Sequence, residues 1–207
     1  MTKVKVYGSK TATCTQRILI LLEELELDYE LINIDLTKGE QKTPAFMTMQ
    51  PFGKIPAIKI GRTVLFESRA ILRYLAKNAT DKHDLTLNDN VNVEVWLEAE
   101  SQNFNPPISK IVYEKIFKKM SNKKEDASVV AQSLEDLKKV LEVYEKRLEK
   151  NHFMAGRSFS IVDISHIPYT KYFINSGYED LLKNDYPHFY KWFLRVCERN
   201  SVKKILS

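Results

Sequence analysis

The periodicity of the hydrophobic residues changes once along this chain of 207 residues, close to residue 80. Before that point, strand-like and helix-like patterns alternate: residues 3–7 alternate polar and apolar side chains, whereas apolar residues in 18–25 recur at helical spacing. After it, only helical spacing occurs, for example over residues 134–148. This change predicts two domains of different fold class, a mixed α/β domain followed by an all-helical one.

The domain boundaries follow from the same patterns. Residues 1–78 predict the order β-α-β, a polar loop with a short helix, and then β-β-α, with a hairpin turn at residues 61–62. Residues 79–89 are polar and aperiodic, which predicts a linker, and residues 90–207 form the predicted helical domain. Pro106 and Pro107 are expected to kink or break its first long helix.

Charge and cysteine content exclude several classes of function. The net charge of +5 is modest and the basic pairs are scattered, whereas nucleic-acid-binding proteins concentrate them in one stripe, so no nucleic-acid partner is expected. Two cysteines, Cys14 and Cys197, favour a reducing compartment. No apolar run reaches membrane-spanning length, and the first residues contain no apolar signal core. We therefore expect a cytoplasmic protein that does not insert into membranes.

Two local patterns have structural rather than catalytic interpretations. Ser160 and Asp163 form the pattern of a capping box, with Phe159 and Ile164 at the positions of a hydrophobic staple, so Asp163 is expected to start a buried helix. The histidines lie far apart and no Cys/His spacing matches a zinc module, so we expect no metal cofactor. They are His83, His152, His166 and His188.

Two other segments suggest contacts with a ligand. Pro56 precedes a strand, and a cis proline there would turn the backbone of Ile55 outward to pair with an extended peptide; an ordinary loop proline is an equal interpretation. Glu67 and Ser68 lie between a strand end and a helix, where first-turn amides form an anion site and Glu67 could pair with an ammonium group. A simple helix cap is the alternative.

The chain resembles the phi class of plant glutathione transferases in five segments that occur in the family's order. These are residues 6–8, 39–44, 51–56, 65–71 and 154–168. The resemblance implies a thioredoxin-like N-terminal domain, a C-terminal helical bundle, glutathione as co-substrate and a homodimer. In that dimer, Phe52 would insert into the helical domain of the partner subunit.

The resemblance also implies which residues bind glutathione: Gln41, Lys42, Lys54, Ile55, Pro56, Glu67 and Ser68. Glu67 and Ser68 would hold the γ-glutamyl end, and Ile55 would pair with the cysteinyl backbone. Gln41 and Lys42 stand where the family has histidine and lysine, at the glycine carboxylate, and a fixed cation suits that anion. Lys54 replaces a glutamine of the family. The departures at Gln41 and Lys54 should alter the affinity for glutathione without removing the site.

The catalytic serine of the family is absent. Its position falls on Ala12, whose side chain cannot donate a hydrogen bond to the glutathione sulfur. Thr13 or Thr11 could supply the donor instead, or the helix N-terminus could stabilise the thiolate through its amides and dipole. Cys14 could act as a nucleophile that forms a mixed disulfide with glutathione. A fourth interpretation is that conjugation is weak and the protein mainly binds its ligands.

That fourth interpretation has support in the turn itself. A branch of the phi class associated with anthocyanins and flavonoids has a similar turn, and this chain shares with it Ala12, Cys14, Gln16 and Arg17. Thr15 stands where that branch often has proline. A non-catalytic carrier of such ligands is therefore the alternative to a transferase that acts on plant small molecules, and glutathione-dependent isomerisation, lysis or reduction is a third possibility.

A second-substrate pocket is expected between the two domains. Its predicted walls are Lys10, Leu36, Phe104, Ile111, Phe117 and Met120. A hydrophobic or phenolic small molecule would fit apolar walls with Lys10 at the mouth. Aromatic residues at helical spacing also suit a plain core, and a turn lysine is also simply solvated.

Overall fold

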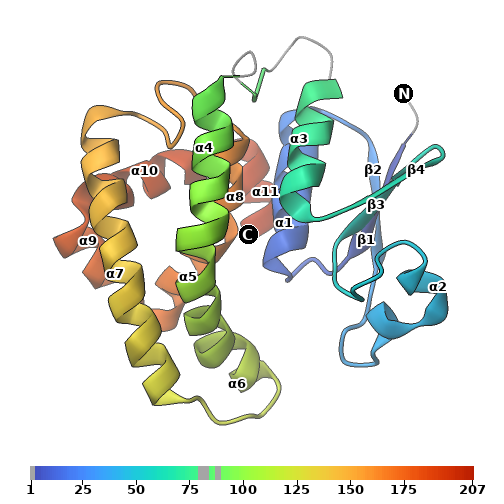
Figure 1. Ribbon diagram of the computed structural model, residues 1–207, viewed down its shortest axis with the longest axis horizontal. Coiled ribbons are helices and arrows are strands. Elements are labelled where there is room, and N and C mark those ends of the chain that lie inside the picture. Colours follow the sequence, from blue (N-terminus) through green and yellow to red (C-terminus); the bar gives the residue numbers. More distant parts are fainter. Residues whose placement is uncertain (1–2, 79–83, 87–89) are drawn as a thin grey trace. The chain divides into compact units, whose positions relative to one another are not determined.

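The computed structural model describes residues 3–78, 84–86 and 90–207, and these fall into two compact units (Figure 1). Most of the predicted linker at 79–89, together with His83, lies outside the described residues. One unit comprises Met1–Thr86 and Asn200–Ser207, and the other comprises Leu87–Arg199. The mixed α/β class of the first and the helical class of the second confirm the predicted fold class.

The first unit is built on a four-stranded sheet in the order β2-β1-β3-β4. The strands are β1 (Val4–Gly8), β2 (Tyr29–Asn33), β3 (Ala57–Ile60) and β4 (Thr63–Phe66). β1 and β2 run parallel, whereas β3 is antiparallel to both of its neighbours. The parallel pair requires a crossover connection, and helix α1 (Thr13–Glu24) provides it.

Helices α1 and α3 (Ser68–Asn78) lie side by side on one face of the sheet (Figure 1). The apolar residues 18–22 of α1 are completely buried there or nearly so. Gly8, at the end of β1, allows the close approach, because a Cβ at this position would lie 2.5 Å from Oγ1 of Thr15. The short helices η1 (Glu40–Lys42) and α2 (Pro44–Met47) occupy the long connection between β2 and β3.

The last helix, α11 (Asn200–Leu206), corrects the predicted boundary between the two domains. It packs against α1 in the first unit, where Ser201 donates a hydrogen bond to Glu24 and Lys204 forms an ion pair of 2.8 Å with Glu23. The sequence pattern placed residues 90–207 in one domain because α11 has the same helical periodicity as the rest of that segment. Helical periodicity shows that a helix has an apolar face, but not which partner covers that face.

The second unit is all helical. Its elements are α4 (Val91–Ala99), η2 (Glu100–Phe104), α5 (Asn105–Val112), η3 (Tyr113–Phe117), α6 (Lys118–Met120), α7 (Ala127–Lys150), α8 (Ile161–Phe173), η4 (Ile174–Tyr178), α9 (Glu179–Asp185) and α10 (Pro187–Cys197). Pro106 and Pro107 do not interrupt the helical path. They lie in the first turn of α5, directly after the π-helical turn η2, whose wider backbone accommodates residues that lack an amide hydrogen.

The predicted capping box starts α8. Ser160 accepts a hydrogen bond from the amide of Val162, and Asp163 accepts one of 2.9 Å from the amide of Ser160. Asp163 also accepts from the amide of Met154 and from Nε1 of Trp192. Complete burial raises the pKa of Asp163 to about 6 although these donors favour its charged form. The predicted structural role of Asp163 is thus confirmed by its contacts.

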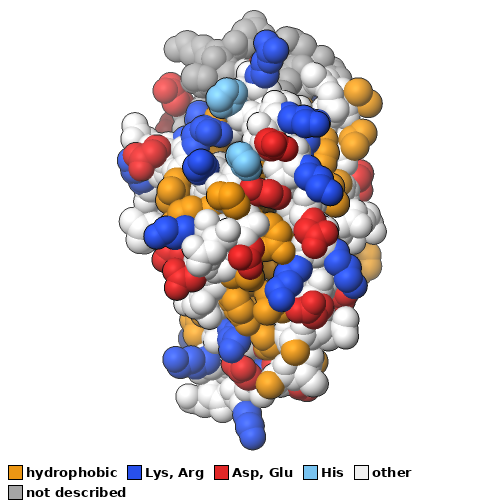
Figure 2. Space-filling view, turned by 90° about the vertical axis from the view of Figure 1, so that its left-hand side faces the viewer, with side chains coloured by type: hydrophobic (Ala, Val, Ile, Leu, Met, Phe, Trp, Pro, Cys, Tyr) orange, Lys and Arg blue, Asp and Glu red, His pale blue; other side chains and the backbone are white. Residues whose placement is uncertain are grey.

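The charged side chains are distributed rather than concentrated on the face that Figure 2 shows. Lysines and arginines there are interspersed with aspartates and glutamates. This is the pattern of solvated helix faces with mixed charges. Among the described residues, no helix is both long enough and apolar enough to cross a membrane.

Candidate functional site

The register of the sheet brings three of the predicted ligand-binding segments to one edge. Tyr7 of β1 pairs with Ala57 of β3, and Ala57 pairs in turn with Phe66 of β4. The residues that follow Tyr7, precede Ala57 and follow Phe66 therefore lie next to one another. These are the turn at residues 8–13, the dipeptide Ile55-Pro56, and the dipeptide Glu67-Ser68. The candidate site is this edge of the first unit.

Of the two interpretations left open for Pro56, the structure shows the cis one, since the Ile55-Pro56 peptide bond is cis. The side chain of Ile55 packs against a small apolar cluster that includes Ile34, Phe46 and Ala57. Its backbone amide and carbonyl have no hydrogen-bond partner in the part of the chain that the structure describes. A half-buried side chain that anchors the segment and an unpaired backbone leave the main chain of Ile55 free to bind an extended ligand.

Glu67 and Ser68 form the second part of the site. Glu67 has a φ of 67°, in the left-handed region that residues other than glycine rarely adopt. Such strained residues concentrate at ligand-binding positions. Ser68 opens helix α3 and is 5% exposed, and its Oγ lies 3.3 Å from Nη1 of Arg17, which donates to it. First-turn amides, a hydroxyl and a guanidinium thus meet where the sequence predicted an anion site.

The third part contains Lys42 and the loop before Pro56. Nζ of Lys42 donates a hydrogen bond of 3.0 Å to the carbonyl of Phe52. Gly53 makes room for this lysine, because a Cβ at Gly53 would lie 2.6 Å from its Cδ. The Gln50 side chain accepts from the amide of Lys54 and thereby orders the loop. Oε1 of Gln41 is buried with no hydrogen-bond partner among the described residues, so a ligand N–H could satisfy it.

Ala12 is the N-cap residue of α1. Its backbone is extended, with φ −82° and ψ 124°, and no side chain caps the helix. The first intrahelical bond runs from the amide of Gln16 to the carbonyl of Ala12 at 2.9 Å. The amides of Thr13, Cys14 and Thr15 therefore have no partner among the described residues, and three unpaired donors point out of the helix end.

The hydroxyls and the thiol around Ala12 differ in their availability. Thr11 is exposed, and its hydroxyl lies 3.2 Å from that of Ser9. Thr13 is 4% exposed, and its hydroxyl makes no hydrogen bond to any described residue. Cys14 is half-buried, and its Sγ accepts an N–H from Arg17 at 3.7 Å. The turn itself is tied to α1 by Nε2 of Gln16, which donates to the carbonyl of Lys10.

The predicted wall residues of the second-substrate pocket fall into different environments. In the first unit, Lys10 and Leu36 are exposed. In the helical unit, Met120 is 66% exposed, and Phe117 is half-buried with its ring against Tyr172. Phe104 and Ile111 are completely buried and expose no surface to a ligand. The Phe104 ring instead packs against Tyr144, His166 and Phe189 in the core of the helical unit.

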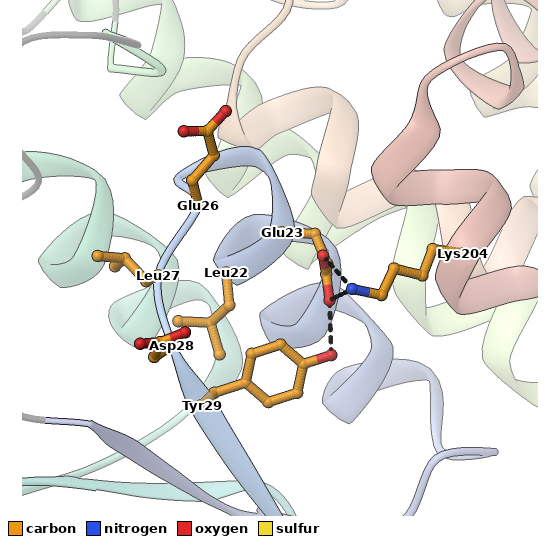
Figure 3. A pocket seen from close by; sticks show the side chains of 7 residues that line it. All are labelled: Leu22, Glu23, Glu26, Leu27, Asp28, Tyr29 and Lys204. Atoms are coloured by element: carbon orange, nitrogen blue, oxygen red, sulfur yellow. Dashed lines mark hydrogen bonds and ion pairs between the residues drawn. The ribbon is translucent and has the colours of Figure 1, made fainter.

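A hollow of about 460 Å³ lies at the opposite end of α1 from Ala12 (Figure 3). Glu23 makes two polar contacts in this hollow: it accepts a hydrogen bond from Tyr29 and forms an ion pair with Lys204. Burial and the neighbouring Glu23 raise the pKa of Tyr29 to about 12. Glu26 and Asp28 lie along its rim. The contacts of Glu23 fix α11 to α1, so the polar residues at this end of the helix have a structural role.

Comparison with known proteins identifies the family. The family model for the glutathione S-transferase N-terminal domain matches residues 2–77, and that for the C-terminal domain matches residues 104–200. A probable glutathione S-transferase GSTF1 of Oryza sativa subsp. japonica is 44% identical to this chain over an alignment of 213 positions. The alignment covers 100% of this chain and 97% of that protein.

Solved structures agree with this assignment. Glutathione transferase F7 of Populus trichocarpa has a TM-score of 0.92 and 36% identity, over 98% of this chain and 97% of that one. Glutathione S-transferase I from maize, solved in complex with an atrazine glutathione conjugate, has a TM-score of 0.89 and 35% identity, over 98% and 96%. The chain belongs to the glutathione S-transferase family, within the plant phi class.

Proposed function

We propose that this protein binds glutathione at the edge of its sheet and transfers it to a small molecule. Glu67 pairs with the γ-glutamyl ammonium group, while Ser68 and the first-turn amides of α3 hold the carboxylate next to it. The backbone of Ile55 pairs with the cysteinyl residue, since its amide and carbonyl are otherwise unpaired. This proposal follows from the register that brings the three segments together.

The glycine end of glutathione is bound by the loop that carries Lys42 in the same proposal. The Lys42 ammonium group attracts the carboxylate, and Oε1 of Gln41 accepts the peptide N–H of the ligand. Lys54 adds a second cation to this part of the site. Gly53 keeps Lys42 in place, because any side chain at this position would collide with it.

Thiolate formation is assigned to the N-terminus of α1 instead of the side chain at position 12. Three unpaired amides and the positive end of the helix dipole favour a thiolate that lies in front of them. The unpaired hydroxyl of Thr13 adds a fourth donor, whereas that of Thr11 is bonded to Ser9. The uncapped end of α1 is the single observation that carries the proposal of an active enzyme.

The second substrate is proposed to be a hydrophobic or phenolic plant metabolite. Exposed Lys10 and Leu36 supply a cation and an apolar surface on the first unit. Phe117 and Met120 remain the candidates on the helical unit. We further propose a cytoplasmic homodimer in which Phe52, which is 63% exposed, contacts the partner subunit.

A carrier of flavonoid-like ligands is the alternative function. The observation that favours it is the alanine at the N-cap of α1, which offers no side-chain donor to the sulfur. A carrier needs a bound ligand but no thiolate. The two functions therefore differ in one measurable property, the pKa of the thiol of bound glutathione.

Titration of the thiolate by its ultraviolet absorbance tests the proposal. We expect a thiol pKa at least one unit below that of free glutathione, together with measurable conjugation of a generic aromatic halide. A thiol pKa equal to that of free glutathione, with tight binding, would instead establish the carrier. The double variant Glu67→Ala/Ser68→Ala should lose affinity in calorimetry, while Glu30→Ala, at an exposed carboxylate on β2, should not.

A further inference from the structure

We propose that Arg17 is a positioning residue that fixes the hydroxyl of Ser68 as a hydrogen-bond donor to the carboxylate of an anionic ligand. The inference rests on the proposed function, because it deepens the role given there to Ser68. Arg17 lies in α1 and Ser68 opens α3, so the contact joins two helices through residues that are 51 positions apart in the sequence.

Arg17 is buried, which restricts the acceptors that its N–H groups can reach. Its side chain is 0% exposed and is among the largest fully buried side chains of the protein. A buried guanidinium is costly unless its N–H groups are bonded, so its donors are directed to specific acceptors. Two of these are Oγ of Ser68 at 3.3 Å and Sγ of Cys14 at 3.7 Å, both reached from the same nitrogen, Nη1.

The chemistry of the two groups determines the direction of the hydrogen bond. A guanidinium has donors only, so Ser68 must accept from Arg17. A hydroxyl has one proton and two lone pairs, and accepting from Arg17 leaves that proton free to point elsewhere. Since Ser68 is only 5% exposed, few groups compete for the proton. A carboxylate in front of the first turn of α3 is the acceptor that this arrangement suits.

Arg17 also contributes charge at short range. A cation that is shielded from water acts through a low effective dielectric constant, so it attracts a bound anion more strongly than a surface lysine does. The same charge repels a cationic ligand group at this position. Arg17 therefore selects for an anion twice, through its own charge and through the orientation of the Ser68 hydroxyl.

A double-mutant cycle tests this coupling. Ser68→Ala should weaken glutathione binding about 10- to 100-fold, the range for one hydrogen bond to a charged group. Arg17→Met should weaken it by a similar factor in the parent protein, but by at least 5-fold less when Ser68 is already alanine. Arg62→Met, at an exposed arginine of the β3–β4 turn, is the matched control and should leave affinity unchanged.

A second ligand separates positioning from a general structural role. 4-Aminobutyryl-cysteinylglycine lacks only the γ-glutamyl carboxylate, so its affinity should be the same in Arg17→Met and in the parent protein. If Arg17→Met does not fold, Arg17→Lys replaces it. This variant keeps the charge but not the planar fork of donors, and should lose affinity for glutathione but not for the truncated ligand.

Each outcome decides between the hypotheses. Additive effects of Arg17→Met and Ser68→Ala, or equal loss of affinity for both ligands, would overturn the positioning role while leaving the glutathione site intact. Unchanged glutathione binding in Ser68→Ala would instead reject the proposed γ-glutamyl site itself. Coupling of at least 5-fold that is confined to glutathione would establish Arg17 as the residue that orients Ser68.

Discussion

Substitution of Ala12 by serine would supply the side-chain donor that the resemblance to the phi class implies for this position. The backbone at Ala12 is already extended, as an N-cap residue requires. The introduced hydroxyl would accept a hydrogen bond from the free amide of Cys14 or Thr15, and it keeps its own proton for the glutathione sulfur. The substitution thus adds one helix cap and one thiolate hydrogen bond without altering the fold.

The cap should stabilise the protein measurably. Replacing alanine by serine at an N-cap contributes about 1 kcal/mol. For a chain of this size, that corresponds to a rise in Tm of roughly 2–4 °C. This gain depends only on the geometry of α1 and is expected with or without glutathione.

The effect on rate is the balance of two terms. One charge-assisted hydrogen bond contributes about 1.5–3 kcal/mol and so lowers the thiol pKa by about 1 to 2 units. The thiolate population then rises about 10- to 100-fold as long as the pKa stays above the assay pH, while each unit of lost basicity reduces its nucleophilicity about 3-fold. The net expectation is a conjugation rate about 3- to 11-fold higher.

Ala12→Asp is the matched control. An aspartate caps the helix as well as a serine but cannot donate to a thiolate, so it should raise Tm while it raises the thiol pKa and slows conjugation. Ala12→Ser should be assayed by thiolate absorbance, by conjugation of an aromatic halide and by thermal unfolding. A higher Tm with unchanged thiol pKa and rate would show that the sulfur does not lie in front of α1, and would refute the proposed thiolate site.

Three further predictions concern other parts of the molecule. The pKa of Asp163 in the folded protein, about 6, exceeds its ordinary value of 3.8, so this carboxyl lowers the free energy of unfolding as pH rises between these values. In urea unfolding, Asp163→Asn should abolish this part of the pH dependence. An unchanged dependence of the free energy of unfolding on pH would contradict burial of Asp163 as its cause. Gly53→Ala should displace Lys42 and weaken glutathione binding in calorimetry several-fold, and equal affinity would show that Lys42 does not contact the ligand. Phe52→Ser should shift the mass measured by light scattering toward monomer, whereas a full dimer at low micromolar concentration would reject Phe52 as the anchor.

Local sequence signals predicted the fold class and the order of the elements in residues 3–78 correctly. The strands and helices of the first unit occur in the predicted order, because their periodicities are set by neighbours a few residues away. The capping box at Ser160 and the cis bond at Pro56 are also local features, and both are present. The sheet register then explains why segments 50 residues apart in sequence form one edge, which no local pattern contains.

Features that depend on tertiary partners could not be predicted. In the sequence, Arg17 is notable only as part of the shared turn, because nothing in the pattern indicates that a charged side chain at the start of α1 is 0% exposed. Phe104 and Ile111 were predicted to line a pocket, but helical spacing does not distinguish a buried core face from a pocket wall. The position of α11 beside α1 escaped prediction for the same reason.

On the proposed assignment, two of the three anionic groups of glutathione, the thiolate and the γ-glutamyl carboxylate, are bound by different sets of donors. The thiolate lies before the three free amides of α1 and the hydroxyl of Thr13, so the side chain at position 12 is one donor among several. The γ-glutamyl carboxylate has one side-chain hydroxyl, that of Ser68, and Arg17 holds this hydroxyl in place. A change at Ala12 should alter the conjugation rate only about 3- to 11-fold, because lost nucleophilicity offsets most of the gain in thiolate, whereas loss of the Ser68 hydroxyl should weaken glutathione binding about 10- to 100-fold. On this assignment, an alanine at position 12 is compatible with catalysis, whereas an alanine at position 68 is not compatible with tight glutathione binding.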